Sequence, residues 1–434
     1  MHLTLKEIQN DPHIDIEAVE TCIRSSMLHV GSLVLEKLLN AHHGTDTGKQ
    51  MRCGNGHTPV FIGYRYKEVV TVLGRIRLRR RYYYDHACHR GWCPKDRALD
   101  IEGTALSPGM RRIMSRVGAL RSFGCGEEDI KELAGIDVTA KEIERISHHI
   151  GEEVKTFLAQ YSDAAVPENH HEHCSQATTM YLCMDGTGVP VVRAETIGRK
   201  GKGEDGQAKT REAKLGCIFT QTTVDSEGNP VRDEDSTSYV GAIETVEEFT
   251  HRIVREGRRR GATNAQKLCI IGDGAPWIWN LADEYFYGAT QIIDLYHARQ
   301  HYWTVAHLVF ATEKKQMYAW AKKRREELDD GKVEQVINAI AHLCPATKDV
   351  EEKCEKEMKY FYKNRERMRY NRFRTQDLFV GSGVLEAGCR TVIGQRLKQS
   401  GMHWSVKGAN SIIALRCCLL SHRWEDFWAY RTAA

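Results

Sequence analysis

The spacing of apolar and polar positions divides the first part of the chain into three regions. In residues 1–48 apolar side chains recur at three- and four-residue steps, which predicts a helical segment. Residues 49–100 contain two runs in which apolar and polar positions alternate on either side of Gly74, and this predicts a β-hairpin. Residues 101–161 return to a helical spacing.

The second helical region contains a candidate helix-turn-helix. Residues 135–138 predict a turn, and Thr139 with Glu142 predicts a capping box at the start of a second helix. A DNA-binding protein would place such a helix in the major groove. The exposed side of this helix carries several glutamates, which phosphates repel. A plain helical hairpin is therefore the alternative.

The remainder of the chain predicts an α/β domain with a helical interruption. Residues 162–178 are polar and predict a linker. In residues 179–300 strand and helix patterns alternate, with TMYLCMD, VPVVRAE and AKLGCIFTQTTV as the first three predicted strands. Residues 301–380 are highly charged and helical in pattern, and helices continue through 381–434. We therefore expect a multidomain α+β protein.

Acidic residues stand at the predicted ends of two apolar strands. Asp185 follows Tyr181–Met184, and Asp273 follows Leu268–Gly272. An acid in this position points into the crevice where α/β sheets bind ligands. Oxygen ligands of this kind suit Mg²⁺, which takes one or two carboxylates and leaves room for phosphates.

A third acid is expected beyond the helical interruption. Glu386 stands out because its small neighbours, Ala387 and Gly388, permit close packing against a catalytic face. The alternative is an ordinary glutamate at a helix N-terminus, where the helix dipole favours it.

Composition narrows the class of protein. The 434 residues include 62 Lys and Arg against 58 Asp and Glu, a formal net charge of +4, and 41% are hydrophobic. These values favour a packed globular chain over general disorder. Neither a membrane-spanning run nor a signal-peptide layout is present in the sequence, so we expect a cytoplasmic protein with no membrane partner. Most of its fourteen cysteines are then expected to be buried thiols.

Positive charge is concentrated in short stretches, which predicts a polyanionic partner such as double-stranded DNA. The alternative for any one stretch is the solvated face of an ordinary helix. The candidate DNA-binding residues are Arg75, Arg77, Arg79, Lys214, Arg365, Arg369, Arg372, Arg396 and Lys398.

Four stretches in fixed order resemble a known family. They are CMDGTGVPV, GDGAPWIWN, IIDLYHA and VLEAGCR, the last continuing to IGQRLKQSGMHWS. The chain resembles DDE-type transposases of bacterial insertion sequences, in particular the Kra-type group, which is distantly related to the Mutator-like transposases. The resemblance covers most of the chain. It implies a ribonuclease-H-like α/β catalytic core with an all-α insertion, preceded by helical and zinc-ribbon-like DNA-binding modules.

The resemblance also implies the site and its chemistry. Asp185, Asp273 and Glu386 correspond to the catalytic triad that holds two Mg²⁺ or Mn²⁺ ions, with Asp294, His297 and Arg390 as accessory residues. Such enzymes cleave DNA at the ends of the element and join those ends to target DNA by phosphoryl transfer. Because two ends must be brought together, a homodimer or higher oligomer is implied, acting at the bacterial nucleoid.

A zinc site is implied near the hairpin. Four N and S ligands at the two ends of a hairpin suit structural Zn²⁺. The candidate ligands are Cys53, His57, Cys88 and Cys93, with His86 and His89 as substitutes. The sequence departs from the family's usual pair of Cys-x-x-Cys knuckles, and packing without metal is the alternative.

Two other functions are compatible with the same residues. A metal-dependent nuclease or resolvase on this fold would cut DNA but not join it. A domesticated, sequence-specific DNA-binding protein would keep the fold without catalysis, although the intact acids argue against this. A strand-transfer assay separates these functions.

Overall fold

A computed structural model describes residues 15–42, 57–160, 179–201, 206–381 and 383–433. The chain divides into two compact units, Met1–Ile150 and Gly151–Ala434. The predicted linker at 162–178 lies outside the described residues. Among the helices in the described ranges, none is both long enough and apolar enough to cross a bilayer.

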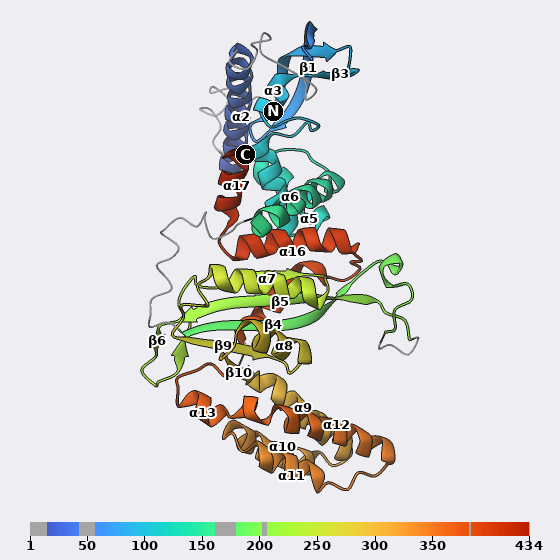
Figure 1. The fold of residues 1–434 in the computed structure, drawn as a ribbon. Helices are drawn as coiled ribbons and strands as arrows, with labels where there is room; N and C mark the ends of the chain where they lie inside the picture. Colours follow the sequence, from blue (N-terminus) through green and yellow to red (C-terminus); the bar gives the residue numbers. More distant parts are fainter. Residues whose placement is uncertain (1–14, 43–56, 161–178, 202–205, 382, 434) are drawn as a thin grey trace. The chain divides into compact units, whose positions relative to one another are not determined.

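The first unit contains the predicted hairpin. Strand β1 (Val60–Thr71) pairs antiparallel with β2 (Gly74–Asp85), and β3 (Arg90–Trp92) pairs with the end of β2 (Figure 1). Along β2, Ile76 and Leu78 are buried while the intervening arginines are exposed, which confirms the predicted alternation.

A long helix packs against this hairpin. Helix α2 (Ile16–Ala41) uses two polar side chains to bind the backbone of β2. The Glu36 carboxylate accepts from the Arg77 amide at 2.7 Å, and the Asn40 side chain bonds both Arg77 and Arg79. These bonds satisfy backbone groups of β2 that no strand pairs.

The two helices of the predicted helix-turn-helix form, as they also would in a plain helical hairpin. After α3 (Pro94–Ala98) and α4 (Pro108–Leu120), α5 (Phe123–Ala134) ends at Gly135, whose φ of 68° is left-handed. Helix α6 (Ala140–Gln160) begins with the predicted capping box, in which Thr139 and Glu142 bond each other's backbone amides. The local signals therefore identified this pair of helices correctly.

The second unit is built on a mixed five-stranded sheet with the strand order β10-β9-β4-β5-β8. Strands β4, β5 and β8 are antiparallel neighbours, whereas β9 and β10 run parallel to β4. The strands are β4 (Thr179–Pro190), β5 (Thr210–Gln221), β8 (Ser238–Ala242), β9 (Lys267–Gly272) and β10 (Thr290–Ile293), and a small separate sheet contains β6 (Thr223–Val224) and β7 (Pro230–Val231).

One predicted strand boundary was wrong. We expected a strand to end at Asp185 and a second to follow, but β4 continues without a break from Thr179 to Pro190. The reason is that β5 pairs with β4 over its whole length, so Gly186 and Gly188 are held extended by a partner distant in sequence. The residues beyond form a short 3₁₀ turn, η2 (Arg193–Thr196), rather than the predicted strand.

Helices cover the sheet and form the predicted all-helical segment. Helices α7 and α16 lie on one side of the sheet, and α9 to α13 gather beyond β10 (Figure 1). The bounds are α7 (Val246–Arg259), α8 (Pro276–Tyr285), α9 (Leu295–Val309), α10 (Lys314–Asp329), α11 (Val333–Ala341), α12 (Lys348–Asn364), η3 (Arg365–Met368) and α13 (Tyr370–Arg374). The last elements are α14 (Gly383–Gly388), the π-helical turn η4 (Cys389–Gly394), α15 (Gln395–Leu397), α16 (Val406–Leu420) and α17 (Trp424–Ala433).

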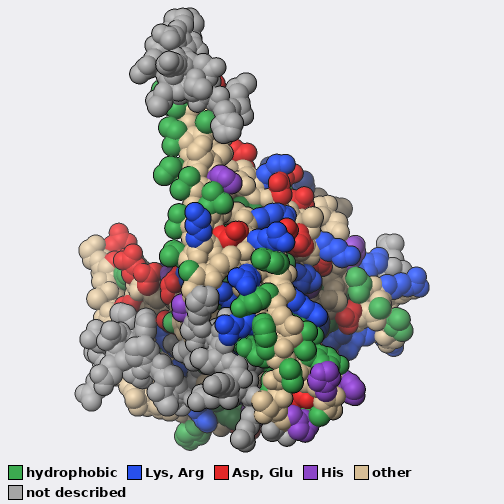
Figure 2. Space-filling view, turned by 90° about the horizontal axis from the view of Figure 1, so that it is seen from above, with side chains coloured by type: hydrophobic (Ala, Val, Ile, Leu, Met, Phe, Trp, Pro, Cys, Tyr) green, Lys and Arg blue, Asp and Glu red, His purple; other side chains and the backbone are tan. Residues whose placement is uncertain are grey.

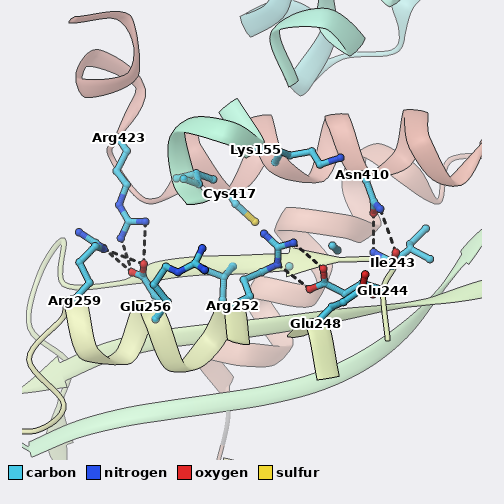
Figure 3. Close-up of a pocket in the computed structure, with 16 residues that line it drawn as sticks. Lys155, Ile243, Glu244, Glu248, Arg252, Glu256, Arg259, Asn410, Cys417 and Arg423 are labelled. Atoms are coloured by element: carbon cyan, nitrogen blue, oxygen red, sulfur yellow. Dashed lines mark hydrogen bonds and ion pairs between the residues drawn. The ribbon is translucent and has the colours of Figure 1, made fainter. Parts of the chain in front are cut away.

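A pocket of about 290 Å³ beside β8, α7 and α16 is lined by charged side chains that bind one another (Figure 3). The buried Glu256 carboxylate accepts from Arg259 at 2.6 Å and from Arg423 at 3.2 Å. Glu244 accepts two 2.7 Å bonds from Arg252. Because these carboxylates and guanidinium groups pair with one another, we interpret the residues around the pocket as a structural ion-pair network.

We expect Glu256→Gln to lower the free energy of unfolding of this unit by about 3–5 kcal/mol, because two guanidinium groups would lose their buried anionic partner. Denaturant titration followed by circular dichroism measures the loss. The matched control is Glu247→Gln, an exposed position on the same helix, which should change stability by less than about 0.5 kcal/mol. Equal effects at the two positions would contradict the structural role.

Candidate active site

Three aspartates follow the same row of the sheet. Met184 of β4, Gly272 of β9 and Ile293 of β10 are partners across these parallel strands, and in β9 and β10 they are the last residues. The next residues are Asp185, Asp273 and Asp294. Because parallel neighbours lie about 4.8 Å apart, these aspartates lie at the same level of the sheet. Asp273 and Asp294 follow the ends of β9 and β10, whereas Asp185 lies within β4.

Asp185 and Asp273 interact electrostatically. Burial raises the pKa of Asp185, a 2.7 Å hydrogen bond from the Gly186 amide opposes this rise, and the negative charge of Asp273 raises the pKa further. A half-buried carboxyl whose charged form is disfavoured by burial and by a neighbouring acid is typical of a functional site. A divalent cation bound between them would remove this repulsion.

Glu386 is exposed and belongs to α14, a helix that contacts β4. It lies three residues before Cys389, whose thiol donates to the Asp185 carboxylate at 3.5 Å. Residues three apart on a helix share a face, which places Glu386 about one turn from the contact with Asp185. Within the described residues, the three acids do not form a group whose oxygens all lie within 4.8 Å of one another. The all-oxygen donor set nevertheless fits a hard divalent cation.

The accessory residues occupy the start of α9. Asp294 is buried, and its carboxylate caps this helix by accepting from the His297 amide at 2.7 Å. Burial lowers the pKa of His297, the neighbouring His301 lowers it further, and the nearby aspartates oppose this. His297 is therefore expected to be neutral at neutral pH. Arg390 is exposed on η4, one residue after Cys389.

The site includes residues that sequence reasoning missed. Cys389 belongs to the quoted VLEAGCR stretch, so its place one turn after Glu386 was an available signal. His301, Glu357 and Tyr360 come from α9 and α12 and contact His297 or Asp273 directly or through one another. No local pattern identifies Glu357 and Tyr360, because α12 begins more than seventy residues after Asp273, whereas His301 lies four residues after His297.

The hairpin carries its basic residues on an exposed face that also bears tyrosines. The Arg77 guanidinium lies 4.3 Å from the centre of the Tyr66 ring, and that of Arg79 lies 3.7 Å from the Tyr64 ring. Arg75 is exposed on the same face. Elsewhere too, lysine and arginine side chains gather in patches rather than spreading evenly (Figure 2).

Two predicted DNA-binding residues of the second unit are buried. The Lys214 ammonium donates to the Glu244 carbonyl oxygen at 3.0 Å and pairs with Glu212. Arg396 is fully buried, with its guanidinium 5.0 Å from the Trp404 ring. Their charges are enclosed by the protein, which does not favour contact with phosphates. The sequence placed both in basic stretches but could not show which side chains point inward.

The remaining basic residues are better exposed. Lys398 donates to the Thr187 hydroxyl of β4 and lies on the surface. Arg365 and Arg372 line an open pocket of about 490 Å³ beside β10, together with Lys363. Arg369 lies close by, but its guanidinium is held by Glu334 and Glu366 at 2.6 and 2.9 Å.

A second candidate metal centre lies at the hairpin. His57 Nδ1 lies 3.1 Å from Cys88 Sγ and 3.7 Å from Asp85 Oδ2, and the three ligand atoms lie within 4.8 Å of one another. Donor atoms bound to one tetrahedral zinc ion lie about 3.3–3.7 Å apart, so these residues fit Zn²⁺. Of the four predicted ligands, His57 and Cys88 come together, Cys93 is not in this group, and Cys53 lies outside the described residues.

Asp85 was not predicted as a ligand, and neither substitute histidine, His86 nor His89, is in the group. Asp85 is the last residue of β2 and is buried, and its other carboxylate oxygen accepts from the amides of Ala87 and Cys88. The tight turn after β2 therefore brings the aspartate and the cysteine to the same point. A carboxylate can replace a thiolate as a zinc ligand.

For the acidic site, we expect Asp185→Asn to raise the melting temperature of the metal-free protein by about 1–3 °C. The pKa of Asp185 is raised on folding, so its charged form costs stability above that pKa, and this cost disappears as the pH falls below the usual carboxyl range. Differential scanning fluorimetry at pH 7.5 and pH 3.5 measures the difference. Mn²⁺ should stabilise the wild type and not the variant, and equal stabilisation of both would contradict a metal site at Asp185.

For the hairpin site, purified protein should contain about one zinc per chain, and Cys88→Ser should reduce this at least tenfold. Elemental analysis by mass spectrometry measures the metal content. Cys125→Ser removes an exposed cysteine of the same unit and should leave the zinc content unchanged. Full zinc occupancy in Cys88→Ser would exclude this thiol as a ligand.

No protein-family model matches the chain, and no curated protein matches it. Among solved structures, the chain is similar to a chain of the Drosophila P element transposase strand transfer complex. The identity is 8%, the TM-score is 0.27, and the match covers 74% of this chain and 79% of that chain. A TM-score of this size does not establish a common fold.

Proposed function

We propose that this protein is a DDE-type DNA transposase that cleaves the ends of an insertion sequence and joins them to target DNA. The observation that carries the proposal is the placement of Asp185 and Asp273 side by side, just beyond the last row in which β4 and β9 pair. Glu386 would complete the triad. It lies on α14, about one turn before Cys389, whose thiol contacts Asp185.

The order of the sheet supports a ribonuclease-H-like core. Three antiparallel strands come first in the sequence, and two parallel strands then add to the free side of the first strand. The first acid therefore lies on the central strand β4, and the second follows its parallel neighbour. Helices α9 to α13 separate the second acid from the third, as expected for an all-α insertion in such a core.

The side chains of the site have distinct roles in this proposal. Asp185, Asp273 and Glu386 would hold Mg²⁺ or Mn²⁺. The bound ions would activate the attacking hydroxyl and stabilise the departing 3′ oxygen. Asp294 fixes the start of α9, and His297 faces the acids as a neutral imidazole. Arg390 and Lys398, both exposed near the last acid, would neutralise phosphates of the bound DNA.

DNA binding is proposed for each unit by itself. In the first unit, the exposed arginines and tyrosines of β1 and β2 would contact the phosphate backbone, with zinc held by His57, Asp85 and Cys88 stabilising the hairpin. The second helix of the helix-turn-helix is a candidate for base reading. In the second unit, Arg365 and Arg372 provide a basic surface beside β10. A homodimer or higher oligomer would bring two DNA ends together.

The test is cleavage and joining of DNA that carries the sequences flanking the gene for this chain, in Mg²⁺ or Mn²⁺. Wild type should cut the ends and join them to a plasmid target, and Glu386→Gln should reduce both reactions at least about 100-fold, because a ligand of the charged transition state is lost. Glu247→Gln, an exposed acid on α7, is the matched control and should retain full activity.

The possible outcomes separate the alternatives. Cutting without joining would identify a nuclease or resolvase on this fold. Specific binding without cutting by any variant would identify a DNA-binding protein that lacks catalysis. Cutting by Glu386→Gln at the wild-type rate would show that another residue is the third ligand.

A further inference from the structure

Three side chains that belong to none of the family's motifs form a continuous set of contacts behind the acidic site. His301 Nε2 of α9 lies 3.3 Å from His297 Nε2, and its Nδ1 contacts the Glu357 carboxylate of α12. The His301 ring stacks on Tyr360, with 3.6 Å between ring centres and 19° between ring planes. The Tyr360 hydroxyl donates to the carbonyl oxygen of Asp273 at 2.9 Å.

The backbone after Asp273 is shaped to receive Tyr360. Gly274 has a backbone φ of 102°, a value that residues other than glycine rarely adopt. A Cβ atom at this position would lie 2.6 Å from the Tyr360 ring. The turn that carries the second acid therefore favours glycine at this position, both for its backbone conformation and for the close approach of the Tyr360 ring. Gly274 and Tyr360 are both half-buried, so this is not a contact between exposed groups on the surface.

The contacts with His301 determine which ring nitrogens carry hydrogen. A carboxylate accepts hydrogen bonds and cannot donate them, so Glu357 favours hydrogen on His301 Nδ1. With hydrogen on Nδ1 alone, the His301 ring has its lone pair on Nε2 and accepts from His297 Nε2–H. As a result, His297 is left with the lone pair of Nδ1. One carboxylate on α12 thus sets the orientation and the tautomer of both histidines.

We propose that Glu357 and Tyr360 of α12 are positioning residues of the acidic site, with Tyr360 fixing the backbone of Asp273 and Glu357 fixing His297 through His301. The inference rests on the proposed function, because it assigns the helical segment a part in building the proposed active site. Neither residue touches the reacting atoms. Tyr360 acts through Asp273, and Glu357 acts through His301 on His297.

The first experiment measures Mn²⁺ binding to the full-length protein without DNA, by electron paramagnetic resonance. Tyr360→Phe removes one hydroxyl and keeps the ring, and we expect it to weaken Mn²⁺ binding about three- to tenfold through loss of one hydrogen bond to Asp273. The matched control is Tyr362→Phe, an exposed tyrosine on the same helix, which should bind Mn²⁺ as the wild type does. Unchanged affinity in Tyr360→Phe would overturn the role of Tyr360.

The second experiment records the ring-nitrogen resonances of ¹⁵N-histidine-labelled protein, with His301 assigned through His301→Gln. In the wild type His301 should be in the Nδ1–H form, and Glu357→Leu should shift it toward the Nε2–H form. Glu355→Leu, an exposed position on α12, should leave the spectrum unchanged. Identical His301 resonances in wild type and Glu357→Leu would overturn the role of Glu357.

These readouts distinguish the inference from the proposed function. If DNA is neither cut nor joined while both variants behave as expected, the proposed function fails and the positioning role stands. If the wild type binds no Mn²⁺, the metal site and the role of Tyr360 fail together, and the histidine resonances still decide the role of Glu357. If DNA is joined but neither variant differs from its control, the proposed function stands and the inference fails.

Discussion

Parallel pairing between β4 and β9 is the constraint on which the rest of the candidate site depends. The pairing ends at Met184 and Gly272, and the two residues that follow are both acidic. Their proximity has a cost, because burial and mutual repulsion both disfavour the charged form of Asp185. The Gly186 amide and the Cys389 thiol offset part of this cost by donating to the same carboxylate. A positive charge close to Asp185 would remove the rest of this cost.

The helical segment is joined to this edge of the sheet by specific polar contacts. The Tyr370 hydroxyl donates to the Ile293 carbonyl oxygen at 3.1 Å, and the Leu295 amide donates to Val380 at 2.9 Å. With the Tyr360 contact to Asp273, these bonds tie the segment to the ends of β9 and β10. These bonds hold the backbone at Asp273, Ile293 and Leu295.

Local signals identified most of the elements in the sequence. The capping box at Thr139, the hairpin around Gly74 and the short apolar strands around Cys183 and Cys269 all depend on residues within a few positions of one another. Such short-range interactions can be recognised from the sequence alone.

Long-range contacts account for what the sequence could not show. The continuation of β4 beyond Asp185 depends on pairing with β5, and the burial of Lys214 and Arg396 depends on neighbours brought in by the fold. Asp85 joins His57 and Cys88 only because β2 ends in a tight turn. The continuation of β4 and the placement of His57 beside Cys88 therefore depend on partners distant in the sequence.

The contact between Cys389 and Asp185 joins residues 204 positions apart in the chain. During synthesis, β4 leaves the ribosome long before the helix that carries the last acid exists. A nascent chain that has completed the sheet still lacks Cys389, so Asp185 gains this neighbour only after the helical segment has also been made. The order of translation therefore delays assembly of the candidate site until the residues that follow the helical segment have been made.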